Sequence, residues 1–323
     1  MTRRAALKVL TNRNPGQVMA WYLTGMNEHA LGDIQAGINA YTLSIALHPE
    51  CSWAHLNRGW LLLEMDQTHE AIADFDQVIN LGDQNMAWAL VDRGIAKRRL
   101  KDYSGAESDF TAAIEREDAP MRAWYLRAGV RRQLGKVEEA ERDTKVAESL
   151  IASSEMDWTT RGFFRAKSDP EGAIKDFDRA LKLNPRYFKA LQNKAATMAC
   201  QLNRQSDALA VLNQLVDYFP DRVQAHADRG VLLARLGRID EACKEANFSL
   251  GLDRSAIRTY QIGSLYAALC KHDPKFKAEA LRHLSESLRL GLKQREYFKT
   301  DADLDPIRDD PDFRKLAEIA ATL

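Results

Sequence analysis

The amino-acid sequence predicts an all-α fold made of about eight helix–turn–helix repeats, followed by a helical cap at the C-terminal end. The first observation is a set of small residues that recurs every 34 or 35 residues, at Gly25, Gly59, Gly94, Ala128, Gly162, Ala196, Gly230 and Ser264. The second is another set at nearly the same interval, at Gly37, Ala71, Ala106, Ala140, Ala173, Ala208, Ala242 and Ala280. Because the two sets alternate along the chain, they indicate one helix pair copied in series.

Residues 52–85 show what one copy contains. In residues 53–64, apolar side chains lie three and four residues apart, which is the spacing of a helix with one apolar face. Residues 70–81 follow the same pattern. Gly59 in the first helix and Ala71 in the second are small enough for the two helices to pack closely. A pair of this kind cannot bury both of its faces alone, so each copy is expected to stack on its neighbours.

Taken in order, the chain is expected to begin with an arm or partial helix, residues 1–17. The eight repeats then follow at about 18–51, 52–85, 87–120, 121–154, 155–187, 189–222, 223–256 and 257–292. We expect a looser joint at the seam Ala152–Glu155, before the fifth repeat. Repeat five has lost one residue from its turn and repeat eight has gained four, which a turn at the surface tolerates.

Residues 293–323 are expected to cap the last repeat. Asp305 and Asp310 each place an N-capping side chain before a proline at the first helical position, where the missing N–H costs nothing. Two short helices follow from this pattern, and their apolar residues would cover the open face of repeat eight. These residues are Leu304, Ile307, Phe313 and Leu316. The acidic run 301–312 has some spacing of a calcium loop, but Pro306 stands where that loop needs glycine, so helix capping is the preferred interpretation.

The composition argues against several classes of function. The 46 Lys and Arg balance the 46 Asp and Glu, so the net charge gives no reason to expect nucleic acid or an acidic membrane as a partner. No apolar run is long enough for a membrane span or a signal peptide, which favours a soluble, cytoplasmic protein. The four cysteines lack CxxC spacing and the seven histidines are scattered, so we expect no metal site and no cofactor. No catalytic constellation can be assembled, and the chain is predicted not to be an enzyme.

Comparison of the repeats with one another reveals five arginines that each have an acidic counterpart. An arginine immediately precedes the small first-helix residue in five copies, and those copies carry an acid 15 or 16 residues further on. The pairs are Arg58–Asp74, Arg93–Asp109, Arg127–Asp143, Arg161–Asp176 and Arg229–Glu245. We expect them to be structural, partly buried ion pairs within the repeats. Removing one partner from a dry pair would cost about 3–5 kcal/mol.

Aromatic residues and prolines at fixed offsets make the repeat more specific. Aromatic side chains lie four residues before the first small residue or four after the second, at Trp21, Trp124, Trp158, Tyr260, Tyr41, Phe75, Phe110 and Phe177, and Pro49, Pro185 and Pro220 close three copies. A helix pair with this pattern resembles the tetratricopeptide repeat over residues 18–292. The resemblance implies a right-handed superhelix, an α-solenoid whose first helices line a concave groove. It also implies an interaction scaffold that binds a protein or peptide segment in that groove.

The same resemblance implies which side chains point into the groove. The candidates are Tyr22, Met26, Trp53, Asn57, Trp60, Trp88, Asp92, Arg98, Arg99, Arg122, Tyr125 and Arg132. Their aromatic rings form an apolar strip beside a small basic cluster, which would suit a partner with apolar anchors and an acidic flank. Two alternatives stay open: the tryptophans pack between repeats, or the arginines are a solvated face. Repeats six and seven are more polar, with Asn193, Lys194, Gln224 and Asp228.

A narrower resemblance concerns chaperone binding. Tetratricopeptide domains that hold chaperone C-termini use a clamp of Lys, Asn and Arg side chains. Here only Asn57 matches, and the other clamp positions of the first three repeats hold Tyr22, Met26, Trp88 and Asp92. A chaperone adaptor of that kind is therefore not expected. The partner and the oligomeric state are left open by the sequence.

A further resemblance concerns a regulatory setting. Residues 190–194, 229–237 and 301–313 look like parts of the C-terminal repeat arrays of bacterial serine/threonine protein kinases. The kinase itself is missing, since the chain has no glycine-rich loop, no HRD stretch and no DFG. The resemblance therefore implies, as the alternative function, a recruitment or regulatory module of a bacterial kinase system.

Overall fold

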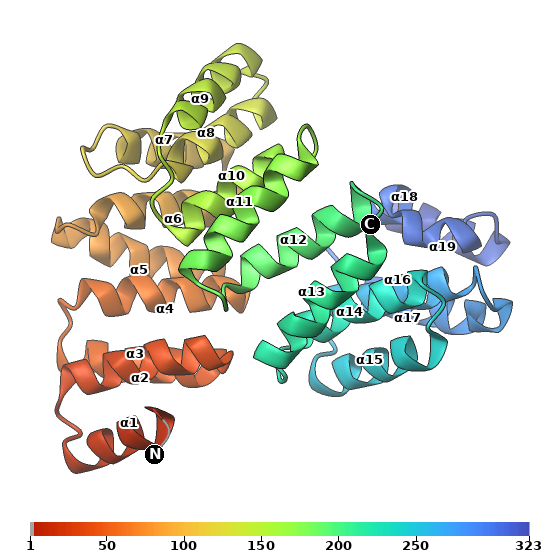
Figure 1. Ribbon diagram of the computed structural model, residues 1–323, viewed down its shortest axis with the longest axis horizontal. Coiled ribbons are helices and arrows are strands. Elements are labelled where there is room, and N and C mark those ends of the chain that lie inside the picture. Colours follow the sequence, from red (N-terminus) through yellow and green to blue (C-terminus); the bar gives the residue numbers. More distant parts are fainter. Residues whose placement is uncertain (1–2, 323) are drawn as a thin grey trace. The chain divides into compact units, whose positions relative to one another are not determined.

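The computed structural model describes residues 3–322, and every regular element in this part of the chain is a helix (Figure 1). The predicted all-α class of repeated helix pairs is confirmed. Contacts divide the chain into two compact units, unit 1 (residues 1–190) and unit 2 (residues 191–323).

Unit 1 consists of a leading helix and five helix pairs. The leading helix is α1 (Arg3–Arg13), where the sequence predicted an arm or partial helix. The first helices of the pairs are α2 (Val18–Leu31), α4 (Ser52–Glu64), α6 (Met86–Arg99), α8 (Arg122–Gln133) and α10 (Glu155–Arg165). The second helices are α3 (Ile34–Leu47), α5 (Thr68–Leu81), α7 (Tyr103–Ile114), α9 (Val137–Ser149) and α11 (Pro170–Leu183).

Unit 2 continues the pairs and ends in short helices. Helix α12 (Phe188–Cys200) begins at the end of unit 1 and continues into unit 2. The pairs are completed by α13 (Gln205–Tyr218), α14 (Val223–Arg235), α15 (Ile239–Leu252), α16 (Ala256–Leu269), the 3₁₀ turn η1 (Pro274–Phe276) and α17 (Lys277–Arg289). The C-terminal segment forms α18 (Tyr297–Thr300), the 3₁₀ helix η2 (Ala302–Ile307) and α19 (Pro311–Thr322).

The C-terminal segment packs its apolar side chains against the last helix pair. Leu304, Ile307 and Phe313 are buried and Leu316 is half-buried. Helix η2 contacts α16, and α19 contacts α17. Asp310 caps α19 by accepting the Asp312 and Phe313 N–H groups at 2.9 and 3.3 Å, which satisfies donors at the helix start.

Small first-helix residues make room for the aromatic rings of the second helices. A Cβ atom on Gly59 would lie 2.5 Å from the Phe75 ring, and one on Gly162 would lie 2.6 Å from the Phe177 ring. Carbon atoms prefer separations of roughly 3.5–4.0 Å, so these rings need glycine opposite them. Both rings are fully buried. The 34-residue recurrence of small residues therefore reflects how closely two helices of a pair approach.

Most turns within a pair contain one residue with a left-handed backbone. After α4 this residue is Asp66, with φ of 60°. The N–H of Gln67 donates to the Leu62 carbonyl at 2.9 Å and that of Asp66 to the Leu63 carbonyl at 3.2 Å. These two bonds end an α-helix in the Schellman pattern and turn the chain into the next helix.

The joint between the two units is not at the predicted place. We expected it at Ala152–Glu155, but the division falls at Ala190/Leu191. The seam at Ala152–Glu155 is held by Asp157, which is buried and accepts the Arg122 N–H at 3.1 Å. A buried carboxylate that caps the neighbouring repeat ties the two repeats together, so the serines of this seam do not loosen it.

Candidate functional site

The five Arg–acid pairs all join the first helix of a pair to its second helix. Arg58 donates to both carboxylate oxygens of Asp74 at 2.8 and 2.7 Å. The same two-bond geometry joins Arg93 to Asp109, Arg127 to Asp143 and Arg161 to Asp176 at 2.6–3.0 Å. In unit 2, Arg229 donates through Nε and Nη2 to a single oxygen of Glu245. Each acid is buried, so these carboxylates are out of reach of a partner.

Two of these pairs include a histidine. In α4, His55 Nδ1 lies 2.8 Å from Asp74 and its Nε2 lies 3.0 Å from the Pro49 carbonyl. In α14, His226 has the corresponding contacts, with Glu245 at 2.6 Å and the Pro220 carbonyl at 2.8 Å. Two of the three prolines that close a copy, Pro49 and Pro220, therefore help to hold a histidine against the acid of the pair.

Six of the groove candidates, five of them aromatic or apolar, lie on the first helices α2, α4 and α6 of unit 1. We call Tyr22, Met26, Trp53, Asn57, Trp60 and Trp88 the unit 1 strip. Met26 is 41% exposed and Trp53 45% exposed. Tyr22, Trp60 and Trp88 pack partly against the core of the first repeats, which fixes their ring positions. The strip therefore combines two exposed apolar side chains with anchored aromatic rings.

Three of the groove candidates are not accessible, and the prediction that they line an open groove is wrong for them. Asp92 is 1% exposed, Arg122 2% and Tyr125 1%. Arg122 forms an ion pair with Asp92 at 2.9 Å and its guanidinium lies 4.5 Å from the Trp88 ring centroid. Tyr125 stacks on Phe164 with ring centroids 5.3 Å apart. The stacking of repeats three, four and five covers these side chains.

The ion pair beneath the strip is strongly desolvated. Burial raises the pKa of Asp92 to about 6, although Arg122 and the nearby Trp60 act in the opposite direction. One carboxylate oxygen of Asp92 and the Nε of Arg122 have no hydrogen-bond partner. The pair therefore joins two repeats at an electrostatic cost.

The remaining arginine candidates lie at the C-terminal ends of α6 and α8. Arg98 is half-buried and Arg99 is exposed, and partial desolvation lowers the pKa of both guanidinium groups. Arg99 donates to the Leu63 carbonyl. Arg132 is exposed and donates to the Thr144 hydroxyl at 2.9 Å. Basic charge is thus present on α6 and α8, as the sequence predicted, but Arg122 is not part of it.

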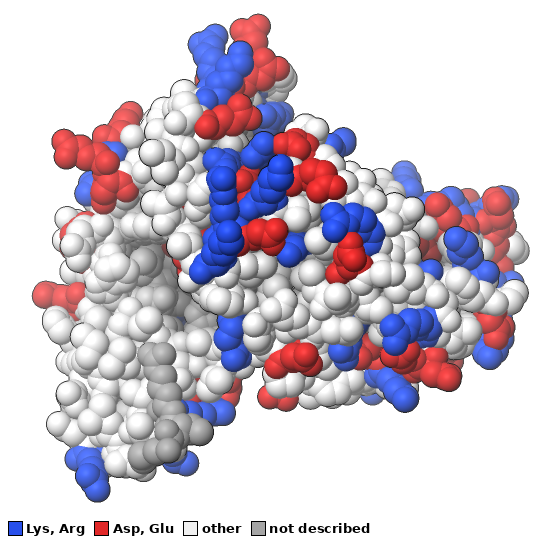
Figure 2. Space-filling model, viewed as in Figure 1, with Lys and Arg blue, Asp and Glu red and all other residues white. Residues whose placement is uncertain are grey.

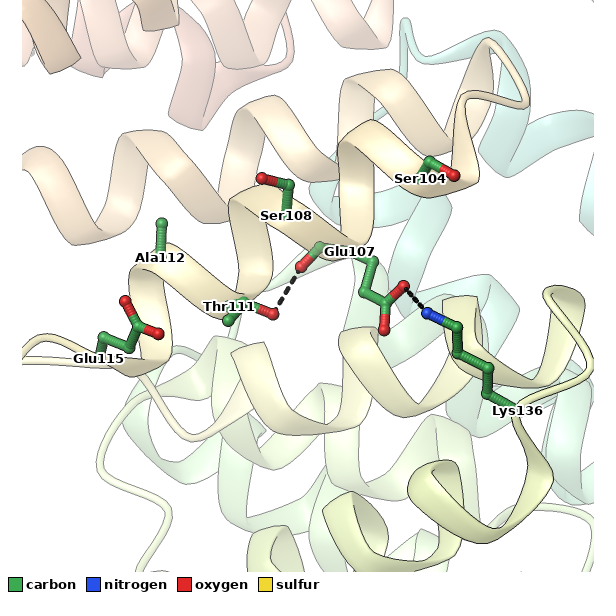
Figure 3. A pocket seen from close by; sticks show the side chains of 7 residues that line it. All are labelled: Ser104, Glu107, Ser108, Thr111, Ala112, Glu115 and Lys136. Atoms are coloured by element: carbon green, nitrogen blue, oxygen red, sulfur yellow. Dashed lines mark hydrogen bonds and ion pairs between the residues drawn. The ribbon is translucent and has the colours of Figure 1, made fainter.

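The second helix α7 carries a shallow hollow that the sequence did not predict (Figure 3). Its volume is ≈ 390 Å³ and its wall is α7, with Ser104, Ser108 and Thr111. Glu107 binds Lys136 at 2.7 Å across it. Although burial opposes this, the hydrogen bonds from Lys136 and Arg131 lower the pKa of Glu107. Glu107 and Lys136 neutralise each other, and the remaining charge in the lining is the exposed carboxylate of Glu115.

Basic and acidic side chains are interspersed on the face drawn in Figure 2. This mixture matches the balanced composition. Within residues 3–322, no group of three or more His, Cys, Asp and Glu side chains is arranged to hold a metal ion. No helix in this part of the chain combines the length and the apolar character needed to cross a membrane.

Comparison with known proteins agrees with the repeat geometry. The tetratricopeptide repeat family matches residues 53–81, 91–144 and 193–247. These three segments of the chain are therefore similar to tetratricopeptide repeats. The matches fall in both units, in repeats two to four and six to seven.

Relatives of known function share part of the chain. The Hsp70-Hsp90 organizing protein 3 of Arabidopsis thaliana is 25% identical over 259 residues, which is 75% of this chain and 40% of the relative. The chain thus spans less than half the length of that protein.

Two solved structures share the fold of this chain. Human IFIT1, solved as a dimer with PPP-AAAA, superposes with a TM-score of 0.64 at 13% identity and covers 98% of this chain and 89% of its own. Yeast Tom70 gives a TM-score of 0.54 at 17% identity, covering 85% of this chain and 61% of its own. Identities this low bear on the fold alone.

Proposed function

We propose that this tetratricopeptide array is a non-catalytic interaction scaffold, and that the unit 1 strip binds an apolar segment of a partner protein. The observation that carries the proposal is the exposure of Met26 and Trp53 beside anchored rings. Large apolar side chains at a rigid surface gain much from being covered and lose little freedom on binding. The relationship to an Hsp70-Hsp90 organizing protein supports an interaction role in general.

The chemistry of the partner follows from the neighbours of the strip. Arg98, Arg99 and Arg132 add positive charge on α6 and α8, so an acidic flank next to the apolar anchors would be favoured. Asp92 is committed to Arg122, so it contributes shape and rigidity to the surface rather than charge. The clamp positions hold aromatic and apolar side chains, so we do not propose the carboxylate clamp of chaperone adaptors.

The proposal is tested with a peptide selected against the purified full chain from a random display library. Trp53→Ala is expected to weaken binding of the selected peptide at least tenfold, since an interface Trp often contributes about 2 kcal/mol or more. Because Trp53 is exposed, this variant should keep the thermal stability of the native chain. Val137→Ala is the matched control, since Val137 is also exposed but lies on the second helix α9. If Trp53→Ala bound as well as the control, the strip would not be the binding surface.

The Arg–acid pairs are proposed to be structural rather than part of the binding surface. Asp74→Ala should lower the free energy of unfolding, measured by urea denaturation, by about 3–5 kcal/mol, because it leaves Arg58 without its partner. Peptide affinity should stay unchanged at temperatures where that variant is folded. Loss of affinity without loss of stability would assign Asp74 to recognition instead.

The alternative, recruitment for a bacterial serine/threonine kinase system, rests on the resemblance of residues 190–194, 229–237 and 301–313 to kinase-linked arrays. It predicts that the selected peptide occurs in substrates of a kinase encoded beside this chain. Phosphorylation of such a substrate by that kinase should rise when the array is added and should not rise with Trp53→Ala. An unchanged phosphorylation rate would leave the general scaffold as the better proposal.

A further inference from the structure

Unit 2 contains a cavity of ≈ 410 Å³ lined mainly by its first helices α12, α14 and α16. The C-terminal segment contributes Asp301 and Asp303 to its wall. Short apolar side chains, among them Ala196, Ala199 and Val231, line the part between the polar groups. The cavity is separate from the unit 1 strip and does not depend on the function proposed for it.

Asp228 borders the cavity from α14 and is held by neutral donors. Its carboxylate accepts amide N–H bonds from Gln192 at 2.6 Å, Gln224 at 2.6 Å and Gln261 at 3.1 Å. Arg258 binds Gln224 at 3.0 Å and also binds Gln261, so it reaches the two amides and not the carboxylate. Burial raises the pKa of Asp228, as expected for a carboxylate without a directly bound cation.

Unit 1 has an acid and an arginine at the same repeat positions, but there they bind each other. Asp92 and Arg122 are 30 residues apart, as are Asp228 and Arg258, so the two acids and the two arginines occupy the same repeat positions. In unit 1 the acid and the arginine bind each other directly. In unit 2 the glutamine amides stand between them, and the acid meets the cavity without a bound cation.

The second acid that lacks a bound cation belongs to the C-terminal segment. Asp301 Oδ2 accepts the hydroxyl protons of Tyr260 and Ser264, each at 2.9 Å. The basic side chain in the cavity wall, Arg235, is committed to Asp303 by bonds of 2.7 and 2.8 Å. Among the described residues, no basic side chain forms an ion pair with Asp301.

The two carboxylates border the same cavity. Gln261 binds Asp228 and Ser264 binds Asp301, and these two residues lie three positions apart on α16. A cation placed between the acids would replace the counter-charge that each lacks, while its alkyl chain would lie along the alanine and valine side chains.

We infer that the cavity of unit 2 binds an aliphatic ammonium group, with Asp228 and Asp301 facing the charge and the small apolar side chains covering the alkyl chain. The ammonium group has two chemical sources, the side chain of a lysine in a partner segment or a free alkylamine. Both sources carry the same charge on a chain of similar length.

The test is calorimetric titration of the full chain with two ammonium probes and their neutral counterparts. The lysine probe is Nα-acetyl-lysine N-methylamide and its neutral counterpart carries an Nε-acetyl group. The free-amine probe is n-butylammonium and its counterpart is n-butanol. Both ammonium probes should bind saturably at one site and both neutral compounds should not. Tighter binding of the lysine probe assigns the site to a partner lysine, and tighter binding of n-butylammonium assigns it to a free amine.

Variants separate this cavity from adventitious binding. Asp228→Asn and Asp301→Asn should each weaken ammonium binding at least tenfold. Asp221→Asn is the matched control, since Asp221 is an exposed acid of the same unit. Ala196→Leu fills the cavity without changing any charge and should also abolish binding, which keeps the test valid if an Asp variant unfolds. The inference is overturned if neither ammonium probe binds saturably, or if binding survives both Asp228→Asn and Ala196→Leu.

Discussion

Units 1 and 2 place an acid and an arginine at the same two repeat positions, yet only unit 1 joins them. In unit 1, Trp88 offers its ring face to Arg122, and the stacked guanidinium reaches Asp92 at 2.9 Å. Trp88 and Gln224 hold the same position of their repeats, because each lies four residues before the acid.

In unit 2, Gln224 lies between the arginine and the acid. Gln224 accepts a bond from Arg258 at 3.0 Å through its oxygen and donates one to Asp228 at 2.6 Å through its nitrogen. An amide can accept from a cation and donate to an anion at once, whereas an indole has no oxygen acceptor for the guanidinium, which stacks on its ring face instead. The replacement of Trp88 by Gln224 is therefore one of the changes that separate the dry ion pair from the polar surface facing a cavity.

The largest effect that would sharpen this comparison is the loss of the arginine. Arg122→Gln should lower the free energy of unfolding of unit 1 by about 3–5 kcal/mol, because it leaves the buried Asp92 charge without its partner. Arg258→Gln should cost about 1 kcal/mol, because three amides still bind Asp228. Urea unfolding followed by tryptophan fluorescence for unit 1 and by hydrogen exchange for unit 2 measures both. Equal losses would mean that the amides do not replace the ion pair.

The pH dependence of stability offers a second comparison. The pKa of Asp92 is raised by burial to about 6 in the folded chain, against roughly 3.9 in an unfolded one. The folded chain therefore binds a proton more tightly, so this group contributes most to stability below pH ~4, and that contribution is lost as pH rises to about 6. Two pKa units correspond to about 3 kcal/mol.

Asp92→Asn should remove the loss of stability of unit 1 between pH 4 and 6. The pH dependence that Asp228 gives to the stability of unit 2 should remain. Urea midpoints at four pH values across this window, for the native chain and the variant, provide the measurement. A native chain whose unit 1 gained stability from pH 4 to 6 through Asp92 would contradict the desolvated ion pair.

The smallest expected effect concerns the packing beneath each first helix. Gly59→Ala should cost about 1–3 kcal/mol, because its Cβ would lie 2.5 Å from the rigid Phe75 ring. Gly230→Ala should cost less, since its Cβ would approach the nearest atoms, Glu245 Cβ and Leu265 Cδ1, only to 2.9 Å. Thermal unfolding of both variants gives the comparison. A larger loss for Gly230→Ala would show that unit 2 is packed more rigidly than unit 1.

Much of the fold could be predicted because its information is local. The small-residue recurrence depends on contacts inside one helix pair, such as Gly59 against Phe75, and these contacts repeat with the sequence. The Arg–acid pairs were predictable for the same reason, since 15 or 16 residues span one helix, one turn and part of the next helix. The exposure of Trp53 was predicted from its repeat position, which places it on a first helix.

The candidate sites were less predictable because they depend on how repeats stack. Nothing within one copy indicates that Arg122 covers Trp88 or that Asp157 closes the seam before repeat five. The 30-residue spacing of Asp92 and Arg122 recurs in Asp228 and Arg258, and that recurrence is the signal that could have suggested a contact between copies. The spacing alone would not have distinguished the direct ion pair of Asp92 and Arg122 from the arrangement in which amides stand between Asp228 and Arg258.

The sequence by itself determined the helix pairs, their order, the ion pairs inside them and the apolar character of the capping segment, because periodicity and short spacing act within about 35 residues. The tertiary structure alone decided the division at Ala190/Leu191, the burial of Asp92, Arg122 and Tyr125, and the cavity of unit 2. Those features arise where side chains from different repeats compete for the same partners. Arg235 and Asp303, which bind each other across 68 residues, are an example. Such competition is settled by packing geometry and desolvation rather than by spacing along the chain.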